Sequence, residues 1–329
     1  MGSRTSIALA THNGERYLRE QLASFKEQTI LPDELIVSDD ASDDATAQIL
    51  KDFALSAPFK LRILPFTDRL GYAGNFNRAM LATTGDLVFL CDQDDVWFPT
   101  KLETMLAEAR THPDAMVLMN DVSLTDSSLA PAGITKLEQF RSAGISVDRY
   151  LMGAAAAVRR EFLEAVMPVP TGYPAHDDWI IKLAIGIGRR HLLPIPLQYY
   201  RIHGSNTSRF RVNSLRRVSP LSVSRSRLDQ LLRGKPLEID QDRLALLTLE
   251  SSGAKRASEH ASGQLSADFD RLAQRLSERM IVMQRRLAVR GLPRLERIGK
   301  IRELLREGGY SAYRGYASAL LDFLAPVAP

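Results

Sequence analysis

Hydrophobic residues in the first 120 positions form short runs, and a segment with helical spacing follows each run. The runs cover residues 7–10, 34–38, 61–64, 87–91 and 116–119, and each predicts a strand. After the first run, Tyr17, Leu18, Leu22 and Phe25 recur at helical spacing. We also expect helices over 75–83 and 99–109. Repeated strand–helix units predict an α/β fold with a mostly parallel sheet flanked by helices.

The alternation weakens after about residue 150. A helix over 177–187 and a strand over 192–200 are still expected, and beyond residue 211 the pattern becomes helical. Leu272, Leu276 and Met283 alternate there with arginines, as in an amphipathic helix with a basic face. We therefore predict a boundary near 211–220, with one domain over 1–210 and a helical extension over 211–329.

Composition and charge refine this division. The hydrophobic content of 45% and the charged content of 25% are those of an ordinary globular protein. One cysteine, Cys91, makes no internal disulfide. No apolar stretch is long enough to span a bilayer, and no signal region is evident, so we expect a cytoplasmic protein. Formal charge is −5 over 1–210 and +9 over 211–329, which suggests chemistry in the first part and attachment in the second.

Polar clusters follow three of the expected strands. They are Thr11-His12-Asn13, Asp39-Asp40 and Asp92-Gln93-Asp94-Asp95. Ligands of open α/β sheets bind at the carboxyl ends of the strands, so these side chains are the first candidates for a site.

The acidic loop 92–95 has two interpretations. A carboxylate near a helix start is favourable, so the loop could simply cap the next helix. One carboxylate suffices for that, whereas three after an apolar strand fit oxygen ligands of Mg²⁺ or Mn²⁺, which would hold a diphosphate. We favour the metal.

Two later segments carry further candidates. In His176-Asp177-Asp178-Trp179, one carboxylate could cap a helix and the other could act as a general base. The segment 199–206 has two interpretations. It is either an ordinary polar loop, or it contributes Arg201 to bind phosphate and His203 to bind a metal. The sequence has no P-loop, no Gly-x-Gly-x-x-Gly after its first strand, no Gly-x-Ser-x-Gly elbow and no clustered Cys/His zinc ligands.

In their order, these segments resemble the family 2 glycosyltransferases, which have the GT-A fold. The resemblance covers about residues 4–210 and rests on six stretches: 11–13, 37–46, 70–77, 92–95, 176–179 and 200–204. It implies a nucleotide-sugar half over about 1–120 and an acceptor half over about 121–210.

The resemblance also implies roles for individual residues. Asp178 corresponds to the base that activates the acceptor, although Asp177 stands where glutamate is common, which leaves the choice between them open. Asp94, Asp92 and His203 would hold the metal. The expected donor-binding residues are Thr11, Asn13, Asp39, Asp40, Asn75, Asn77, Asp92 and Arg201.

The implied reaction is an inverting transfer of a sugar from a nucleotide donor to a saccharide or lipid-linked acceptor. The combination of motifs most resembles bacterial rhamnosyltransferases that use dTDP-L-rhamnose in O-antigen or capsule synthesis. A UDP-hexose donor is the main alternative. A nucleotidyltransferase or a non-catalytic sugar-binding protein fits less well, because the first loop lacks a glycine-rich basic sequence and every candidate carboxylate is present.

The basic tail has two interpretations as well. The segment 292–305 has apolar residues beside arginines. Such a segment could lie on the anionic inner face of the cytoplasmic membrane. Alternatively, the tail packs on the catalytic part or on a second subunit. We expect no nucleic-acid partner, because the arginines lack interleaved aromatic residues for most of the tail.

Overall fold

The computed structural model describes residues 3–64, 68–204, 214–219, 236–311, 313 and 315–325, with side chains left out at 236–240. The chain divides into two compact units, Met1–Val223 and Ser224–Pro329, and each is described by itself. The boundary that we expected at 211–220 falls partly outside the described residues.

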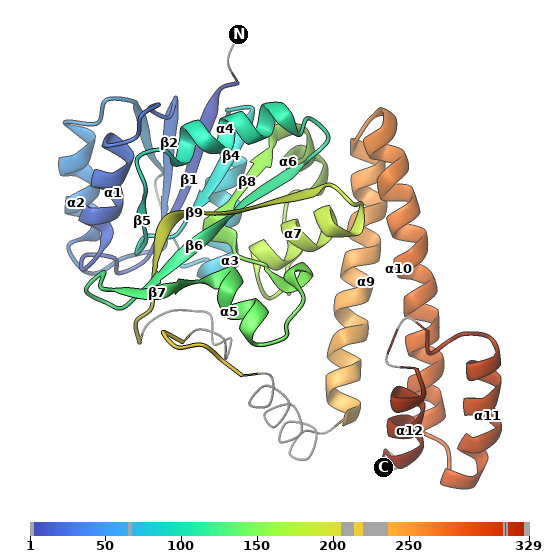
Figure 1. Ribbon diagram of the computed structural model, residues 1–329. Coiled ribbons are helices and arrows are strands. Elements are labelled where there is room, and N and C mark those ends of the chain that lie inside the picture. The colour runs from blue at the N-terminus through green and yellow to red at the C-terminus, as the bar shows by residue number, and fades with distance from the viewer. Residues whose placement is uncertain are drawn as a thin grey trace. The chain divides into compact units, whose positions relative to one another are not determined.

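The first unit contains a nine-stranded sheet in the order β3-β2-β1-β4-β8-β6-β9-β5, with β7 paired to β6 (Figure 1). Its strands are β1 (Thr5–Thr11), β2 (Glu34–Asp39), β3 (Lys60–Leu64), β4 (Leu87–Cys91), β5 (Val96–Trp97), β6 (Val117–Thr125), β7 (Pro131–Thr135), β8 (Ala156–Arg159) and β9 (Arg190–Arg201).

Most strands point the same way. The first four are mutually parallel. Strand β8 runs antiparallel to both β4 and β6, so β6 has the direction of β4, and β9 is parallel to β6. Only β5, β7 and β8 run the other way among the described strands. The α/β class with a mostly parallel sheet is thus confirmed, although β8 separates β4 from β6.

Helices of the first unit cover the sheet. They are α1 (Leu18–Lys26), α2 (Thr46–Ala54), α3 (Gly71–Leu81), α4 (Lys101–Thr111), α5 (Lys136–Ser142), α6 (Arg160–Val166) and α7 (His176–Gly186), with short 3-10 turns η1 (Val147–Arg149) and η2 (Gly153–Ala155). Apolar residues of α1, α2 and α4 pack on one face, where Phe25 and Leu102 join a cluster with Ile7 and Phe89. Side chains alternate along a strand, so Ala8 and Val88 face the other side.

Burial explains which strands are central. All residues of β1, β2 and β4 are buried, as expected for parallel strands covered on both faces. Strand β3, at the sheet edge, is largely exposed. The carboxyl ends of β1, β2 and β4 therefore lie side by side and carry the polar clusters that the sequence placed there.

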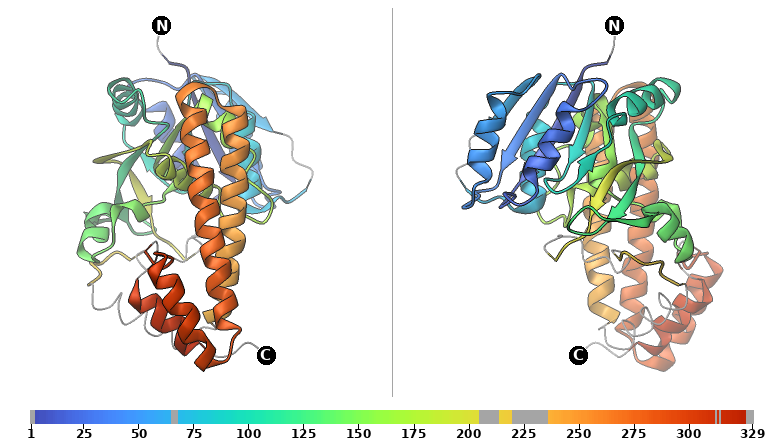
Figure 2. Two further views of the ribbon diagram at one scale, coloured as in Figure 1. Left: turned by 90° about the vertical axis from the view of Figure 1, so that its right-hand side faces the viewer. Right: turned by 60° about the vertical axis from the view of Figure 1, so that its left-hand side comes forward.

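The second unit is helical, as predicted. It contains α9 (Pro236–His260), α10 (Gly263–Arg290), α11 (Arg294–Arg306) and α12 (Tyr316–Leu324). Helices α9 and α10 form a long antiparallel pair (Figure 2). None of the described helices is long and apolar enough to cross a membrane.

The basic face expected on α10 is only partly solvated. Asp322 is fully buried and accepts hydrogen bonds from Arg286 (Nε to Oδ2, 2.8 Å), from Arg290 (Nε to Oδ1, 2.7 Å) and from the Tyr310 hydroxyl (2.9 Å). Buried charges persist where they are paired and hydrogen-bonded, so these arginines join α12 to α10. Part of the positive charge in the tail is therefore structural.

Candidate active site

Thr11 and Asp39 end two adjacent strands and contact each other. The Thr11 hydroxyl donates to Asp39 Oδ1 at 2.6 Å, and Ser42 donates to the same carboxylate through its hydroxyl (2.6 Å) and its amide (3.0 Å). Both Thr11 and Asp39 are buried. The end of β1 and the loop after β2 are thus fixed together at the expected nucleoside end of the site.

Asp40 holds the start of α3. Its carboxylate accepts from the amides of Leu70 (2.5 Å) and Gly71 (2.9 Å), which open the helix that carries Asn75 and Asn77. A carboxylate is stabilising at a helix N-terminus, because it meets unpaired amides there.

The two asparagines of α3 have different surroundings. Asn75 donates through Nδ2 to the carbonyl of Thr11 at 3.0 Å, and its buried Oδ1 finds no hydrogen-bond donor within the described part of the chain. Asn77 accepts at Oδ1 from the amide of Val169 at 3.1 Å. Asn75 therefore points to the end of β1, whereas Asn77 ties α3 to the segment after α6.

The loop after β1 is joined to the acidic loop. Gln93 accepts from the His12 amide (2.9 Å) and donates to the His12 carbonyl (2.8 Å). Gly14 leaves room for this side chain, since a Cβ there would lie 2.3 Å from Gln93 Oε1. Asn13, at φ 48°, accepts from the Asp43 amide at 3.0 Å and so shapes the loop.

The carboxylates of the acidic loop have separate environments. Burial raises the pKa of Asp92 well above its ordinary value, and the charges of Asp94, Asp95 and Asp177 raise it further. Asp94 Oδ2 lies 2.8 Å from His203 Nε2, so two expected metal ligands are in contact. The sequence allowed the acidic loop to cap a helix, but Asp95 precedes the short strand β5.

Asp95 is fully buried in a polar network. It accepts from Gln198 Nε2 at 2.7 Å and from the Arg201 amide at 3.3 Å, and Gln198 in turn contacts the buried Lys101. Burial lowers the pKa of Lys101 to about 7. The acidic loop is thereby fixed to the end of β9.

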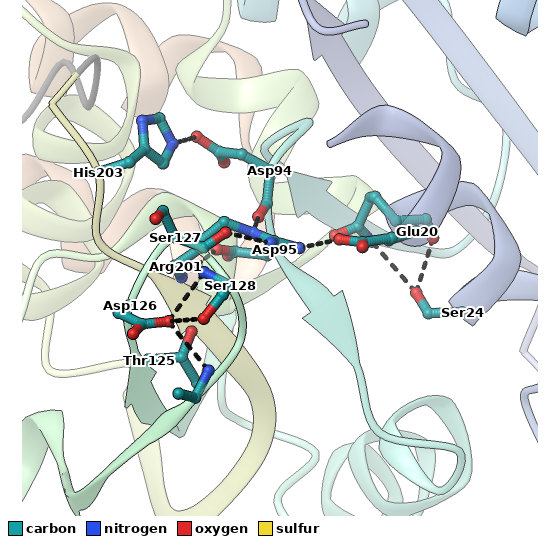
Figure 3. Close-up of polar contacts among 12 residues, drawn as sticks. Glu20, Ser24, Asp94, Asp95, Thr125, Asp126, Ser127, Ser128, Arg201 and His203 are labelled. Atoms are coloured by element: carbon teal, nitrogen blue, oxygen red, sulfur yellow. Dashed lines mark hydrogen bonds and ion pairs between the residues drawn. The ribbon is translucent and has the colours of Figure 1, made fainter. Parts of the chain in front are cut away.

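The Arg201 side chain reinforces this connection (Figure 3). Its guanidinium is 2% exposed; Nε donates to the Asp94 carbonyl at 2.8 Å and NH1 to the Ser127 carbonyl at 2.9 Å. NH2 pairs with Glu20, and the group lies over the Tyr17 ring, 4.4 Å from its centroid. A planar guanidinium offers its donors in a fixed fork, which suits the joining of several segments.

The two carboxylates at the start of α7 differ sharply. Asp178 Oδ2 forms an ion pair with Lys182 at 2.7 Å, one turn later on the same helix. Asp177 accepts from the Asp178 amide at 2.9 Å, and burial together with the Asp178 charge raises the pKa of Asp177 to about 6. Because Asp177 also raises the pKa of Asp92, its carboxyl lies within electrostatic range of the acidic loop.

Three neighbours of Asp177 were given no role in the sequence-based prediction, although His176 lies in the same motif. The Tyr72 hydroxyl is buried, and the charges of Asp92 and Asp177 raise its pKa further. His176 stacks on Phe76 at 3.8 Å between ring centroids. Gly153 comes so near that a Cβ would lie 2.9 Å from Asp177 Cβ. Tyr72 lies within the 70–77 motif, which the sequence reveals. No local sequence pattern indicates that Gly153 contacts Asp177.

The His176 ring is fully buried, and neither of its nitrogens has a hydrogen-bond partner among the residues that the structure describes. Burial lowers the pKa of His176 to about 3, so the ring is neutral at physiological pH. Because the ring is neutral and packs on Phe76, His176 contributes to the packing of α7. The group of this segment whose pKa is raised toward neutrality is Asp177.

Comparisons with known proteins agree with this geometry. Residues 6–165 match the model of glycosyl transferase family 2. An uncharacterised glycosyltransferase, alr2836 from Nostoc sp., is 29% identical over 212 residues, which are 61% of this chain and 65% of that protein. The dTDP-rhamnosyl transferase RfbG of Shigella flexneri is 37% identical over 102 residues, 30% of this chain and 35% of that protein. The chain thus spans less than two thirds of either relative.

The fold has a solved counterpart in TarS 1–349 from S. aureus, whose structure was determined with UDP. The two align with a TM-score of 0.53 and 18% identity, over 85% of this chain and 90% of that one. The sheet, the polar residues at its carboxyl edge and the match over 6–165 agree: residues 6–165, just under half of the chain, resemble a glycosyl transferase family 2 domain, and the fold is of the GT-A type.

Proposed function

We propose that the chain is a metal-dependent, inverting glycosyltransferase. The observation that carries this proposal is that two unlike carboxyl groups, Asp94 beside His203 and Asp177 with its pKa near 6, both raise the pKa of Asp92. The first suits the cation and diphosphate of a donor, and the second suits removal of a proton from an acceptor hydroxyl. In this proposal 1–120 binds the donor, 121–210 the acceptor, and 211–329 serves attachment.

The residues of the acidic loop fit a divalent cation. The charges of Asp94 and Asp95 raise the pKa of Asp92, which shows that these carboxyl groups repel one another, and a cation among them would remove the repulsion. Asp92, Asp94 and His203 would hold Mg²⁺ or Mn²⁺, whose chemistry is to neutralise charge that develops on the departing nucleoside diphosphate. Thr11, Asn13, Asp39, Asp40, Asn75 and Asn77 would position the nucleoside and the sugar.

We assign the base to Asp177 in preference to Asp178. A general base works best when its pKa is close to the pH of the reaction, and the pKa of Asp177 is raised to about 6. Asp178 is neutralised by Lys182 instead. Asp177 would take the acceptor proton as the oxygen attacks the anomeric carbon from the side opposite the leaving group.

We infer for Arg201 a role other than the phosphate contact that the sequence suggested. Its guanidinium engages Glu20, the Asp94 carbonyl and the Ser127 carbonyl, and is 2% exposed. We therefore infer that Arg201 is a positioning residue, which holds the backbone of Asp94 so that its carboxylate meets His203.

The donor sugar is a finer proposal. The sequence motifs and the partial similarity to the Shigella dTDP-rhamnosyl transferase support dTDP-L-rhamnose. Only 30% of this chain takes part in that similarity, and a UDP-hexose is the alternative donor. The acceptor would be a saccharide or a lipid-linked saccharide in the synthesis of a cell-surface polysaccharide.

The second unit has a surface that fits a membrane. Exposed apolar residues gather on α11 and α12, namely Leu295, Ile298, Tyr316, Leu320, Leu321 and Leu324. Exposed Arg294, Arg302 and Arg306 belong to the same unit. Apolar side chains accompanied by arginine suit the interface of an anionic bilayer, and we propose that this unit contacts the inner face of the cytoplasmic membrane.

Release of nucleoside diphosphate from dTDP-L-rhamnose, UDP-glucose, UDP-N-acetylglucosamine and GDP-mannose tests the activity and the donor. We expect release from dTDP-L-rhamnose, loss of release with EDTA, and recovery on addition of Mn²⁺ or Mg²⁺. Preference for a UDP sugar would correct the donor alone. Turnover unchanged by EDTA would contradict the metal, and no turnover of any donor would contradict the proposed function.

The pH dependence of kcat/KM tests the base. A carboxyl of pKa about 6 is protonated and inactive below that pH, so kcat/KM should fall as pH drops through about 6. Asp177→Asn should lower kcat by roughly 10²–10⁴-fold, the usual contribution of a general base. Asp178→Asn is the matched control; it should remain active and shift the acidic limb to lower pH, because the Asp178 charge raises the pKa of Asp177. The opposite pattern assigns the base to Asp178.

Sedimentation of the full chain with lipid vesicles tests the membrane contact. We expect binding to vesicles that contain phosphatidylglycerol and weak binding to phosphatidylcholine alone. Leu320→Ser with Leu324→Ser should reduce the bound fraction several-fold, because each buried CH₂ contributes about 0.8 kcal/mol. The control pair is Leu55→Ser with Leu81→Ser, which are exposed in the first unit. Equal binding by both pairs argues against the contact, and a concentration-dependent dimer would assign the surface to a second copy.

A further inference from the structure

A second group of possible metal ligands lies at the amino-terminal end of β9. Among the residues that the structure describes, Glu108, His112 and His191 are brought together so that one ligand atom of each lies within 4.8 Å of the others. Glu108 is on α4, His112 follows that helix, and His191 is the second residue of β9. Sequence inspection found no clustered Cys/His ligands, because 83 positions separate Glu108 from His191.

The spacing of the ligand atoms fits one small cation. Glu108 Oε2 lies 3.0 Å from His191 Nε2 and 3.3 Å from His112 Nδ1. Ligands at about 2.0–2.1 Å from a tetrahedral zinc ion are roughly 3.3 Å apart, so both separations are close to those of a loaded site. The two imidazole rings stack at 3.7 Å between centroids and 21° between planes. Binding would turn the half-buried rings so that both nitrogens point at the ion.

The backbone that carries His112 is well fixed. Arg159 donates to the carbonyls of Ala109 (2.6 Å), Ala115 (2.7 Å) and His112 (3.3 Å). The amide of Met116 pairs with the carbonyl of Arg189 at 2.8 Å, next to the strand that bears His191. Rigid placement of ligand-bearing backbone lowers the ordering cost of binding, which favours a site over an accidental contact of flexible side chains.

The site is separate from the acidic loop. His191 is near the start of β9 and Arg201 is its last residue. At about 3.3 Å per residue the ten intervening steps correspond to roughly 30 Å. An ion here would not reach a donor bound at Asp94.

We propose that Glu108, His112 and His191 form a binding site for a late first-row divalent cation, with Zn²⁺ as the preferred ion. Two imidazoles and one carboxylate are a ligand set that zinc uses with water in the fourth position, whereas Mg²⁺ prefers oxygen ligands. Because the ligands come from the end of α4 and the start of β9, the ion stabilises the contact between them. The inference does not depend on the proposed transferase activity.

Zinc titration of the untagged full chain tests this proposal. The background carries Asp94→Asn with His203→Gln, which removes two of the three ligands proposed for the other metal site, and metal is first stripped with a chelator. Isothermal titration with ZnCl₂ should give one Zn²⁺ per chain, and a similar concentration of MgCl₂ should not compete. Adding His191→Gln should weaken binding by at least about tenfold, since even loss of a supporting group costs 10–100-fold.

His260→Gln, which changes an exposed histidine of α9, is the matched control and should leave binding unchanged. Thermal unfolding without zinc establishes that each variant is folded, and Zn²⁺ should raise the melting temperature of the background protein but not of the His191→Gln variant. Equal zinc stoichiometry and affinity with and without His191→Gln, or full competition by Mg²⁺, would overturn the proposal.

Discussion

The buried Arg201 side chain connects the segments on which the candidate site depends. Through one guanidinium it contacts Glu20 on α1, the Asp94 carbonyl in the acidic loop and the carbonyl of Ser127 after β6. Its own amide donates to Asp95. Removal of this group would leave the Asp94 and Ser127 carbonyls without their donor, and a buried polar group without a partner is costly. The position of the Asp94 carboxylate therefore depends on the end of β9, more than 100 residues away in the sequence.

The same site accumulates negative charge. Asp92, Asp94 and Asp177 come from the first and second halves of the unit, yet the charges of Asp94 and Asp177 raise the pKa of Asp92, and all three charges raise the pKa of Tyr72. Such an arrangement is tolerated where a cation or a transferred proton relieves it, and clusters of this kind are typical of functional sites. A donor that brings a divalent cation would lower the pKa of the nearby carboxyls, so binding of the donor and readiness of the base would be linked.

Much of this was accessible from sequence, for definite reasons. The strands β1, β2 and β4 are apolar on both faces, and the polar residues after them had to meet at one edge of the sheet. The expected neighbours Asp94 and His203 do lie in contact. The choice between Asp177 and Asp178 was not accessible, because it depends on the burial that raises the pKa of Asp177. The cluster of Glu108 and His191 depends on a contact between α4 and β9 across 83 positions, which no local pattern reveals.

The central claim is that Asp94, held in place by Arg201, joins a divalent cation to a nucleoside diphosphate. Titration of Mn²⁺ into the wild-type chain with and without dTDP or UDP measures this most directly, because a nucleotide whose diphosphate contacts the bound ion must strengthen Mn²⁺ binding by the same factor as Mn²⁺ strengthens nucleotide binding. We predict that the nucleotide strengthens Mn²⁺ binding at least about tenfold, and that Asp94→Asn abolishes the enhancement while Arg201→Lys reduces it. The same enhancement in wild type and in Asp94→Asn would contradict the account.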